Sequence, residues 1–319
     1  MKAARLVGPR QFEILDTPTP TINQGEVLVR IENLSICGSD LLTYDKVFPE
    51  EQYPLRIGLP CHEVSGVIEE SADDRIKKGQ RVVALAYGGS LMEYISCPAD
   101  RVVVVPEHVK PELAVLCQPV GTVLYAVQKL GSVVGKSVVI VGQGPIGMGF
   151  TELLSRAGTS QVIVTDVVQH RIDLALAHGA THGINATKED VAERVKEITG
   201  GKLADIVVEA CGLPETCNQV FDLVRVQGTV VIFGMPHGEP VFPFQWATMY
   251  SKLPNIIVTN SARAGEVYPA VVTMVDLISK GRLDLSYMIS HRIPFNDVGK
   301  AYELFSNRTD NSMKVLINL

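Results

Sequence analysis

The sequence predicts an α/β protein with a β-rich first part and a doubly wound parallel sheet in the second. Residues 1 to about 118 carry short β-branched runs bounded by Pro, Gly and Asp, and helical periodicity there is weak. From about residue 120, apolar strands alternate with helices of about 10–15 residues. Such alternation is typical of a parallel sheet with helices on both faces. The 319 residues are enough for two domains.

In the first part, residues 1–119, short runs predict the strands of a partly barrel-like domain. The expected strands are 27–34, 64–70, 80–86 and 101–107. In the second part, residues 120–262, helices are expected over 121–131, 145–158, 171–180, 189–200 and 215–228, and strands over 137–144, 160–166, 204–212 and 229–235. The tail, residues 263–319, offers only two helices and two strands. We expect it to pack back on the first part, because so few elements cannot build a core of their own.

A glycine-rich turn stands between the expected strand 137–144 and the helix that follows. Its residues Gly142, Gly144 and Gly147 form a G-x-G-x-x-G pattern, with Pro145 and Ile146 between the second and third glycines. The first glycine permits the tight turn, the second admits a pyrophosphate, and the third lets the helix pack on the strand. The helix N-terminus supplies N–H groups and partial positive charge for the phosphates. This pattern predicts a Rossmann dinucleotide site.

An acidic residue ends the next expected strand. Asp166 lies about 20 residues beyond the glycine turn, where a carboxylate accepts both adenosine ribose hydroxyls. The same carboxylate repels a 2′-phosphate, and Val167 and Val168 follow it rather than a basic residue. NAD is therefore favoured over NADP.

Cysteine and histidine recur in the first part. Cys37-Gly-Ser-Asp40 follows one expected strand, and Cys61-His62-Glu63 precedes another. Thiolate and imidazole suit Zn²⁺. Their spacing alone is weak, because a buried thiol and a surface imidazole would look the same in sequence.

The order of motifs along the chain resembles the zinc-containing medium-chain dehydrogenase/reductase superfamily, nearest its polyol and threonine dehydrogenases. The motifs are CGSD, H-E-x-x-G at His62, QRV, MEY, a Gln118-Pro pair, G-x-G-P-I-G and HRIPFNDVGKAYELF. The resemblance implies a GroES-like catalytic domain beside the Rossmann domain. It also implies one catalytic Zn²⁺, NAD, and oxidation of an alcohol to a ketone.

Residue roles follow from the same resemblance. Cys37 and His62 match metal ligands, Glu63 matches an acid close to the metal, and Gln118 holds the third ligand position, where relatives carry Glu or Cys. Glu63, Cys117 or water could complete the metal's coordination instead. The resemblance assigns proton relay to Ser39, orientation of the histidine to Asp40, positions flanking the nicotinamide to Thr122 and Ile146, and a place near the adenosine ribose to Arg171.

Three departures from the family pattern matter. Cys61 replaces the usual Gly before His62, as a small buried side chain or a redox-sensitive thiol. Leu42 stands where relatives often carry a relay His. Only Cys97 lies where the structural zinc lobe would need four cysteines, so no structural Zn²⁺ is expected. We interpret Cys97, Cys211 and Cys217 as packing residues.

Composition narrows the class of partner. A net charge of −6 disfavours nucleic acid, and no apolar run reaches the roughly 18 residues of a membrane span. Six dispersed cysteines and the lack of a signal-like N-terminus favour the cytoplasm. We expect a small alcohol or ketone substrate and a homodimer or homotetramer. Two alternatives stay open: a zinc-free NADPH reductase of quinones or enones, and a non-catalytic NAD(H)-binding sensor.

Overall fold

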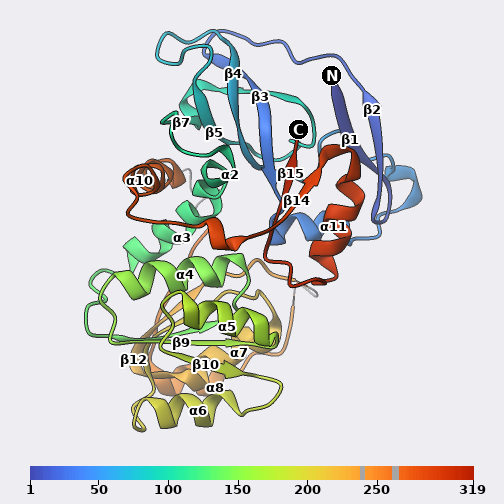
Figure 1. Cartoon of the computed structure of the whole chain (residues 1–319). Helices are drawn as coiled ribbons and strands as arrows, with labels where there is room; N and C mark the ends of the chain where they lie inside the picture. Colours follow the sequence, from blue (N-terminus) through green and yellow to red (C-terminus); the bar gives the residue numbers. More distant parts are fainter. Residues whose placement is uncertain (238–240, 261–265) are drawn as a thin grey trace. The chain divides into compact units, whose positions relative to one another are not determined.

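The computed structural model describes residues 1–237, 241–260 and 266–319, which form two compact units. The first unit joins Met1–Gly121 to Val267–Leu319, and the second is Thr122–Glu266. Both chain termini therefore belong to the first unit (Figure 1). The predicted boundary after residue 262 lies outside the described residues.

A seven-stranded sheet organises the first unit. Its order is β14-β15-β3-β4-β5-β7, with β6 also paired to β3. The strands are β3 (Glu26–Ser35), β4 (Glu63–Ser71), β5 (Arg81–Leu85), β6 (Tyr94–Pro98), β7 (Val102–Val105), β14 (Ile289–Pro294) and β15 (Lys314–Asn318). A separate hairpin, β1 (Lys2–Gly8) and β2 (Gln11–Asp16), and strand β6 were not among the predicted strands.

Strand register brings three segments to one end of β3. Ser35, the last residue of β3, lies opposite Glu63, the first residue of β4. On its other side, Ser35 lies opposite Leu316 of β15. The turn after β3, the segment before β4 and the start of β15 therefore meet at this end of the sheet.

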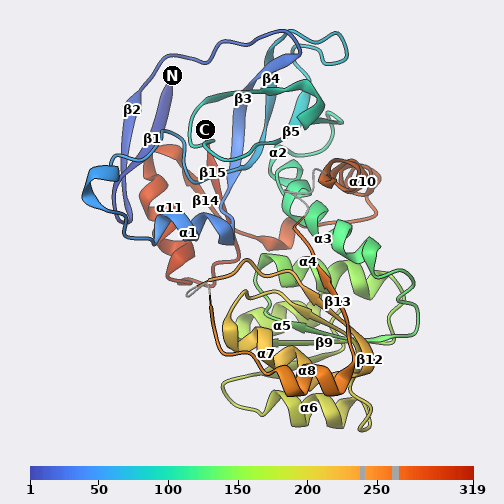
Figure 2. The ribbon, with the colours of Figure 1, turned by 180° about the vertical axis from the view of Figure 1, so that it is seen from behind.

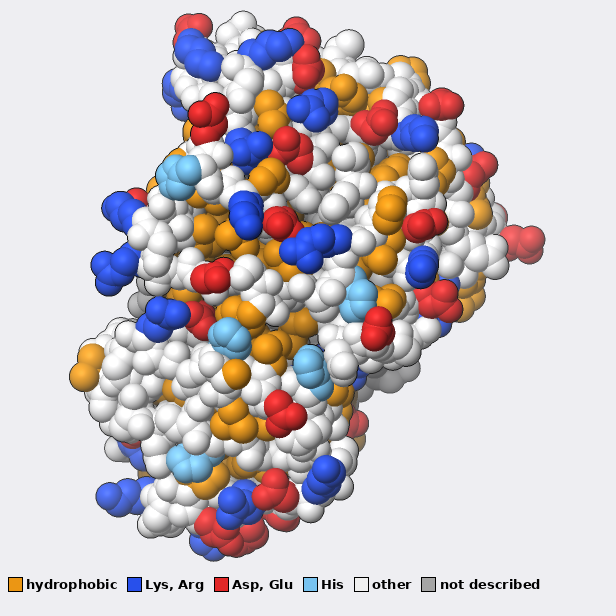
Figure 3. Space-filling view, viewed as in Figure 1, with side chains coloured by type: hydrophobic (Ala, Val, Ile, Leu, Met, Phe, Trp, Pro, Cys, Tyr) orange, Lys and Arg blue, Asp and Glu red, His pale blue; other side chains and the backbone are white. Residues whose placement is uncertain are grey.

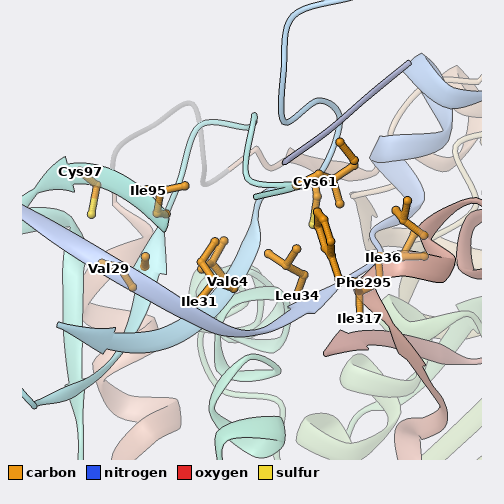
Figure 4. Packing of buried hydrophobic residues seen from close by; sticks show 14 of the residues in the cluster. Val29, Ile31, Leu34, Ile36, Cys61, Val64, Ile95, Cys97, Phe295 and Ile317 are labelled. Carbon is orange, nitrogen blue, oxygen red and sulfur yellow. The ribbon is translucent and has the colours of Figure 1, made fainter. Parts of the chain in front are cut away.

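The inward face of this sheet carries the core of the first unit. Val29, Ile31 and Leu34 of β3 pack with Val64 of β4 and Ile317 of β15, all of them buried (Figure 4). The β-branched residues at alternate positions suit a pleated surface with one buried face. This core packs β3, β4 and β15 together at the end of the sheet where Ser35, Glu63 and Leu316 meet.

Short helices connect the strands of the first unit. They are η1 (Gly38–Asp40), α1 (Leu41–Tyr44), η2 (Glu50–Gln52), η3 (Ala99–Arg101), α2 (Pro111–Ala114), α10 (Val267–Ser279), η4 (Ser286–Met288), η5 (Phe295–Asp297) and α11 (Val298–Ser306). Helix α3 (Cys117–Lys129) crosses the division between the units.

The second unit is a parallel sheet in the order β10-β9-β8-β11-β12-β13. Helices α4 and α5 pack on one face and α6, α7 and α8 on the other (Figures 1 and 2). The strands are β8 (Ser137–Val141), β9 (Gln161–Asp166), β10 (His182–Asn185), β11 (Ala204–Glu209), β12 (Val224–Ile232) and β13 (Asn255–Val258). The helices are α4 (Pro145–Arg156), α5 (Gln169–Ala177), α6 (Val191–Ile198), α7 (Pro214–Leu223) and α8 (Trp246–Lys252). The predicted doubly wound α/β class is thus confirmed, and strand order reverses between β8 and β11.

One predicted helix is too long. The pattern favoured a helix over 215–228, but α7 ends at Leu223 and β12 begins at Val224. Val224 pairs with Ala204 of β11, so sheet pairing overrides the weak helical preference of Val224 and Val226.

Two observations bear on the surface of the molecule. Among the described residues, no helix has the length and apolar character needed to cross a bilayer. On the face drawn in Figure 3, Lys and Arg alternate with Asp and Glu rather than gathering in a basic stripe.

Candidate metal and coenzyme sites

Three potential ligand atoms converge at the shared end of β3 and β4. Cys37 lies in the turn after β3, and His62 and Glu63 stand at the entry to β4. The ligand atoms of these three residues all lie within 4.8 Å of one another. Among the described residues, this group of His, Cys, Asp and Glu side chains is the one with metal-binding proximity.

Asp40 holds two of these residues in place. Its Oδ1 lies 3.0 Å from His62 Nδ1, and its Oδ2 accepts the Cys37 backbone N–H at 3.0 Å. Asp40 is 2 % exposed, so both contacts are shielded from water. A carboxylate on Nδ1 leaves the other imidazole nitrogen free for a metal.

The electrostatics of His62 reflect this partner. Burial acts to lower the pKa of His62, but the Asp40 charge and hydrogen bond, together with Cys37, outweigh it and raise the pKa well above its usual value. His62 therefore favours a charged state beside Asp40, and a bound cation would replace that proton's charge.

Glu63 is fully buried and only half paired. Its Oε2 accepts Lys314 Nζ at 2.5 Å, and Lys314 Nζ also donates to the Ile36 carbonyl at 3.1 Å. Glu63 Oε1 has no hydrogen-bond partner among the described residues. A buried carboxylate oxygen without a donor is costly, and a cation would satisfy it. Sulfur, nitrogen and oxygen together form a donor set that suits Zn²⁺.

The neighbouring cysteines do not join this group. Cys61 lies in the core of the first unit, and burial raises the pKa of its thiol well above the usual value (Figure 4). Cys117 Sγ donates to the Leu113 carbonyl at 3.6 Å, and burial raises its pKa to about 12. Both behave as small apolar side chains rather than reactive thiols. Gln118 is 6 % exposed and its side chain makes none of the hydrogen bonds found among the described residues.

Ser39 lies within reach of the metal group. Its hydroxyl donates to Cys37 Sγ at 3.2 Å, and the side chain is half-buried in η1. A hydroxyl beside a ligand sulfur can contact an atom bound at the same site.

The glycine turn of the second unit has the geometry that its pattern predicts. Gly142 adopts a φ of 93°, in the left-handed region that favours glycine. A Cβ on Gly147 would lie 1.9 Å from the Gly142 carbonyl oxygen, so only glycine fits there. Pro145 opens α4, and no side chain caps the helix at Gly144. The first-turn N–H groups of α4 are thus available to an anion.

Asp166 stands beside this turn at the end of β9. Its Oδ2 accepts the Gln143 N–H at 2.6 Å and its Oδ1 accepts the Val168 N–H at 2.9 Å. Each oxygen keeps a second lone pair for a ribose hydroxyl. Nη1 of Arg171 lies 4.0 Å from the position a Cβ on Gly144 would take, close to the phosphate end of the turn. Ile146 in the first turn of α4 and Thr122 in α3 are half-buried.

Sequence reasoning missed three residues that support these sites. Lys314 binds Glu63, Tyr302 donates to Asp40 at 3.2 Å, and the buried Gln143 side chain accepts Thr151 Oγ1 at 2.9 Å. Lys314 had a detectable signal, because a charged residue stands directly before the apolar run of β15. Tyr302 and Gln143 had none. Cys211, which we interpreted as a packing residue, lies against the glycine turn, since a Cβ on Gly142 would be 2.4 Å from its Sγ.

Comparisons with known proteins agree with the two units. A family model for the alcohol dehydrogenase GroES-like domain matches residues 23–107, and one for zinc-binding dehydrogenases matches residues 145–278. An L-threonine 3-dehydrogenase of Rhizobium etli is 28% identical over 95% of this chain and 94% of its own length. Among solved structures, an alcohol dehydrogenase from Thermus sp. ATN1 has a TM-score of 0.86 at 24% identity, covering 100% of this chain and 99% of its own. A zinc-dependent alcohol dehydrogenase from Streptococcus pneumonia has a TM-score of 0.85 at 25% identity, covering 100% and 98%.

The Lys314–Glu63 pair generates a stability prediction. Replacing Lys314 by Met leaves a fully buried carboxylate without its cation, which costs about 3–5 kcal/mol when one partner of such a pair is removed. We expect K314M to lower the urea unfolding midpoint of the metal-free protein. The matched control is Lys300→Met, because Lys300 is an exposed lysine on α11. Equal midpoints for the two variants would contradict the assigned role of the pair.

Proposed function

The chain belongs to the zinc-containing medium-chain dehydrogenase/reductase superfamily, and from this premise we propose an NAD-dependent dehydrogenase that uses zinc to oxidise a secondary alcohol to a ketone. The observation that carries the proposal is the convergence of Cys37, His62 and Glu63, with the buried Glu63 Oε1 left unpaired. A cation at this point would use a thiolate and an imidazole that Asp40 already orients, and would lie beside the buried Glu63 carboxylate, whose Oε1 has no hydrogen-bond partner.

Cys37 Sγ and the His62 nitrogen opposite Asp40 would hold the zinc ion. Glu63 Oε1, the Gln118 carbonyl oxygen or water would supply further donors. When bound, zinc acts as a Lewis acid that lowers the pKa of an alcohol oxygen. Gln118 is neutral, so a site of this kind carries less negative charge than one completed by Glu or Cys.

Ser39 moves the proton in this proposal. Its Oγ lies 3.2 Å from Cys37 Sγ and would accept the proton of the substrate hydroxyl while its own hydroxyl proton passes to water or to a ribose hydroxyl of the coenzyme. Asp40 keeps His62 in one tautomer and orientation while the proton moves. A bound nicotinamide coenzyme would supply the hydride acceptor, and the residues of this chain would hold and orient it.

The second unit supplies the coenzyme site. The turn of Gly142, Gly144 and Gly147 with the start of α4 would bind the pyrophosphate, and Asp166 would bind the adenosine ribose. Arg171, near Gly144, lies close enough to this turn to contact a phosphate or the ribose. Thr122 and Ile146 would flank the nicotinamide, as their positions in the family pattern imply.

The substrate class is a secondary alcohol such as a polyol, a sugar, a diol or a 3-hydroxy amino acid. An L-threonine 3-dehydrogenase is among the relatives, and its name supports the last of these. Cys37, His62 and Asp166 disfavour a zinc-free NADPH reductase of the same fold. A non-catalytic NAD(H)-binding sensor would show no turnover with any alcohol. A panel of these alcohols with NAD⁺ and NADP⁺, followed as NADH or NADPH absorbance, identifies the substrate.

Removal of the thiolate ligand tests the zinc mechanism. The purified protein should hold about one equivalent of zinc, and Cys37→Ala should lose it together with at least about a hundredfold in kcat/KM, since the metal supplies several kcal/mol of transition-state stabilisation. Metal analysis and initial rates measure both quantities.

Cys97→Ala is the matched control, because Cys97 is a buried cysteine on β6 that belongs to no ligand group. It should keep both zinc and activity. Full turnover by Cys37→Ala, or activity with less than about half an equivalent of zinc, would exclude the proposed mechanism.

Coenzyme choice is tested at Asp166. Replacement by Ser removes the carboxylate that accepts ribose hydroxyls and repels a 2′-phosphate, so the ratio of kcat/KM for NAD⁺ to that for NADP⁺ should fall at least about tenfold. Asp173→Ser, at an exposed position on α5, should leave the ratio unchanged. A wild-type preference for NADP⁺ would contradict the assignment.

A homodimer, or a tetramer built from two such dimers, is the proposed assembly. Among the described residues, β13 is an edge strand of the sheet of the second unit. Its residues Ile256 and Val258 are 40% and 73% exposed. Trp246 and Tyr250 of α8 add exposed aromatic surface beside it. An uncharged edge strand with unpaired N–H and C=O groups can pair with the same strand of a second copy about a two-fold axis.

A charge on the edge strand tests this assembly. Val258→Lys should shift the protein from dimer or tetramer to monomer in light scattering after size exclusion, because paired edges would bring two lysines together. Val134→Lys, a change at an equally exposed valine of the second unit, should have no effect. A monomeric wild-type protein would refute the proposal.

A further inference from the structure

We propose that Tyr302 is a positioning residue for the metal ligands Cys37 and His62, acting through Asp40. The inference rests on the proposed zinc site and extends it to a residue of the C-terminal segment. Tyr302 lies on α11, far along the chain from both ligands, and is fully buried.

The contacts of Asp40 carry the argument. Tyr302 donates its hydroxyl to Asp40 Oδ2 at 3.2 Å, and the same oxygen accepts the Cys37 N–H at 3.0 Å. The other oxygen, Oδ1, lies 3.0 Å from His62 Nδ1. Because Oδ2 is held from two sides, the plane of the carboxylate is fixed and Oδ1 is aimed at the imidazole. One phenol therefore influences both ligands without touching either.

The tyrosine itself is held rigidly. Its ring centroid lies 5.1 Å from that of Phe12 and 5.1 Å from that of Tyr44. Helices α1 and α11 run side by side (Figure 2), and Ser306 donates to Asp45 at 2.9 Å a turn further along. Burial and the nearby Asp40 raise the pKa of Tyr302 well above its usual value, so the hydroxyl stays a donor.

Loss of the hydroxyl should weaken metal binding. With phenylalanine at position 302, Asp40 Oδ2 keeps only the Cys37 amide, and the carboxylate gains rotational freedom. The metal-free site then samples more arrangements, and binding must restrict them. Direct partners of metal-bound histidines change affinity by about 10–100-fold, so a residue one bond further away should change it by about 3–10-fold.

Tyr44 offers a matched control in the same aromatic cluster. It is also buried, and its ring packs against Tyr302. Arg10 lies over its ring at 5.4 Å from the centroid, whereas the tyrosine that donates to Asp40 is Tyr302. Tyr44→Phe therefore removes a buried hydroxyl from the same core without changing the contacts of Asp40.

The experiment measures the zinc affinity of the full-length chain by competition with a chromophoric chelator. The measurement is made without denaturant and at a temperature below the thermal unfolding midpoint of every variant. Tyr302→Phe should bind Zn²⁺ about 3–10-fold more weakly than wild type, and Tyr44→Phe within about twofold of it. The visible spectrum of bound Co²⁺ should shift for Tyr302→Phe only. Equal or tighter zinc binding by Tyr302→Phe, or equal losses in both variants, would overturn the proposal.

A double-mutant cycle tests the route through Asp40. In an Asp40→Asn background, adding Tyr302→Phe should leave zinc affinity unchanged within about twofold, because the aspartate already cannot act. The comparison of Asp40→Asn with the double variant remains usable if Tyr302→Phe alone does not fold, since an asparagine at position 40 carries no charge that would be left without a partner. Additive losses would overturn the proposal. A wild-type chain that binds no zinc overturns the proposed function as well, whereas a zinc-binding wild type with unaffected variants overturns this inference alone.

Discussion

The first unit is organised around a lysine and a glutamate that are buried together, Lys314 and Glu63. Two charges can leave water only if each finds a partner at close range, so the segments that carry them must meet. The pair therefore couples β15, at the end of the chain, to the entry of β4. Strand pairing of β15 with β3 satisfies this requirement and brings the turn of Cys37 to the same place. Such a pair adds little net stability compared with apolar side chains of the same size, but breaking it leaves a buried charge without a partner.

The C-terminal segment thereby has a chemical as well as a structural role. Two acids flank the candidate metal ligands, and each is bound by a side chain from this segment. Lys314 binds Glu63, and Tyr302 binds Asp40. The N-terminal part supplies the candidate ligands Cys37 and His62, and the returning segment supplies the side chains that contact Asp40 and Glu63. A chain that ended after the second unit would contain every ligand and lack the groups that hold them.

In the second unit, close backbone packing rather than a buried ion pair shapes the candidate coenzyme site. Close packing of Gly147 against the Gly142 carbonyl leaves no room for a side chain, and this draws α4 onto β8 with its free N–H groups at the strand end. Gln143, fully buried, bonds to the Gly142 carbonyl and to Thr151 and so braces the turn from beneath. The strand order reverses between β8 and β11, which is the position where sheets of this kind bind dinucleotides.

Local pattern determined much of this protein. Short β-branched runs bounded by Pro, Gly and Asp predicted β3, β4 and β5, and the alternation of strands and helices indicated the doubly wound sheet. The glycine turn and Asp166 were recognisable because their spacing along the chain is short and set by one strand and one helix. Cys37 and His62 were found only through resemblance, since no local pattern joins residues on two separate strands. Tertiary structure alone decided that Glu63 lacks a partner on Oε1, that Cys61 and Cys117 are buried outside the candidate metal group, and that Tyr302 and Lys314 contact its acids. Those outcomes depend on strand register and on burial, which are properties of contacts between distant segments and have no periodicity along the sequence.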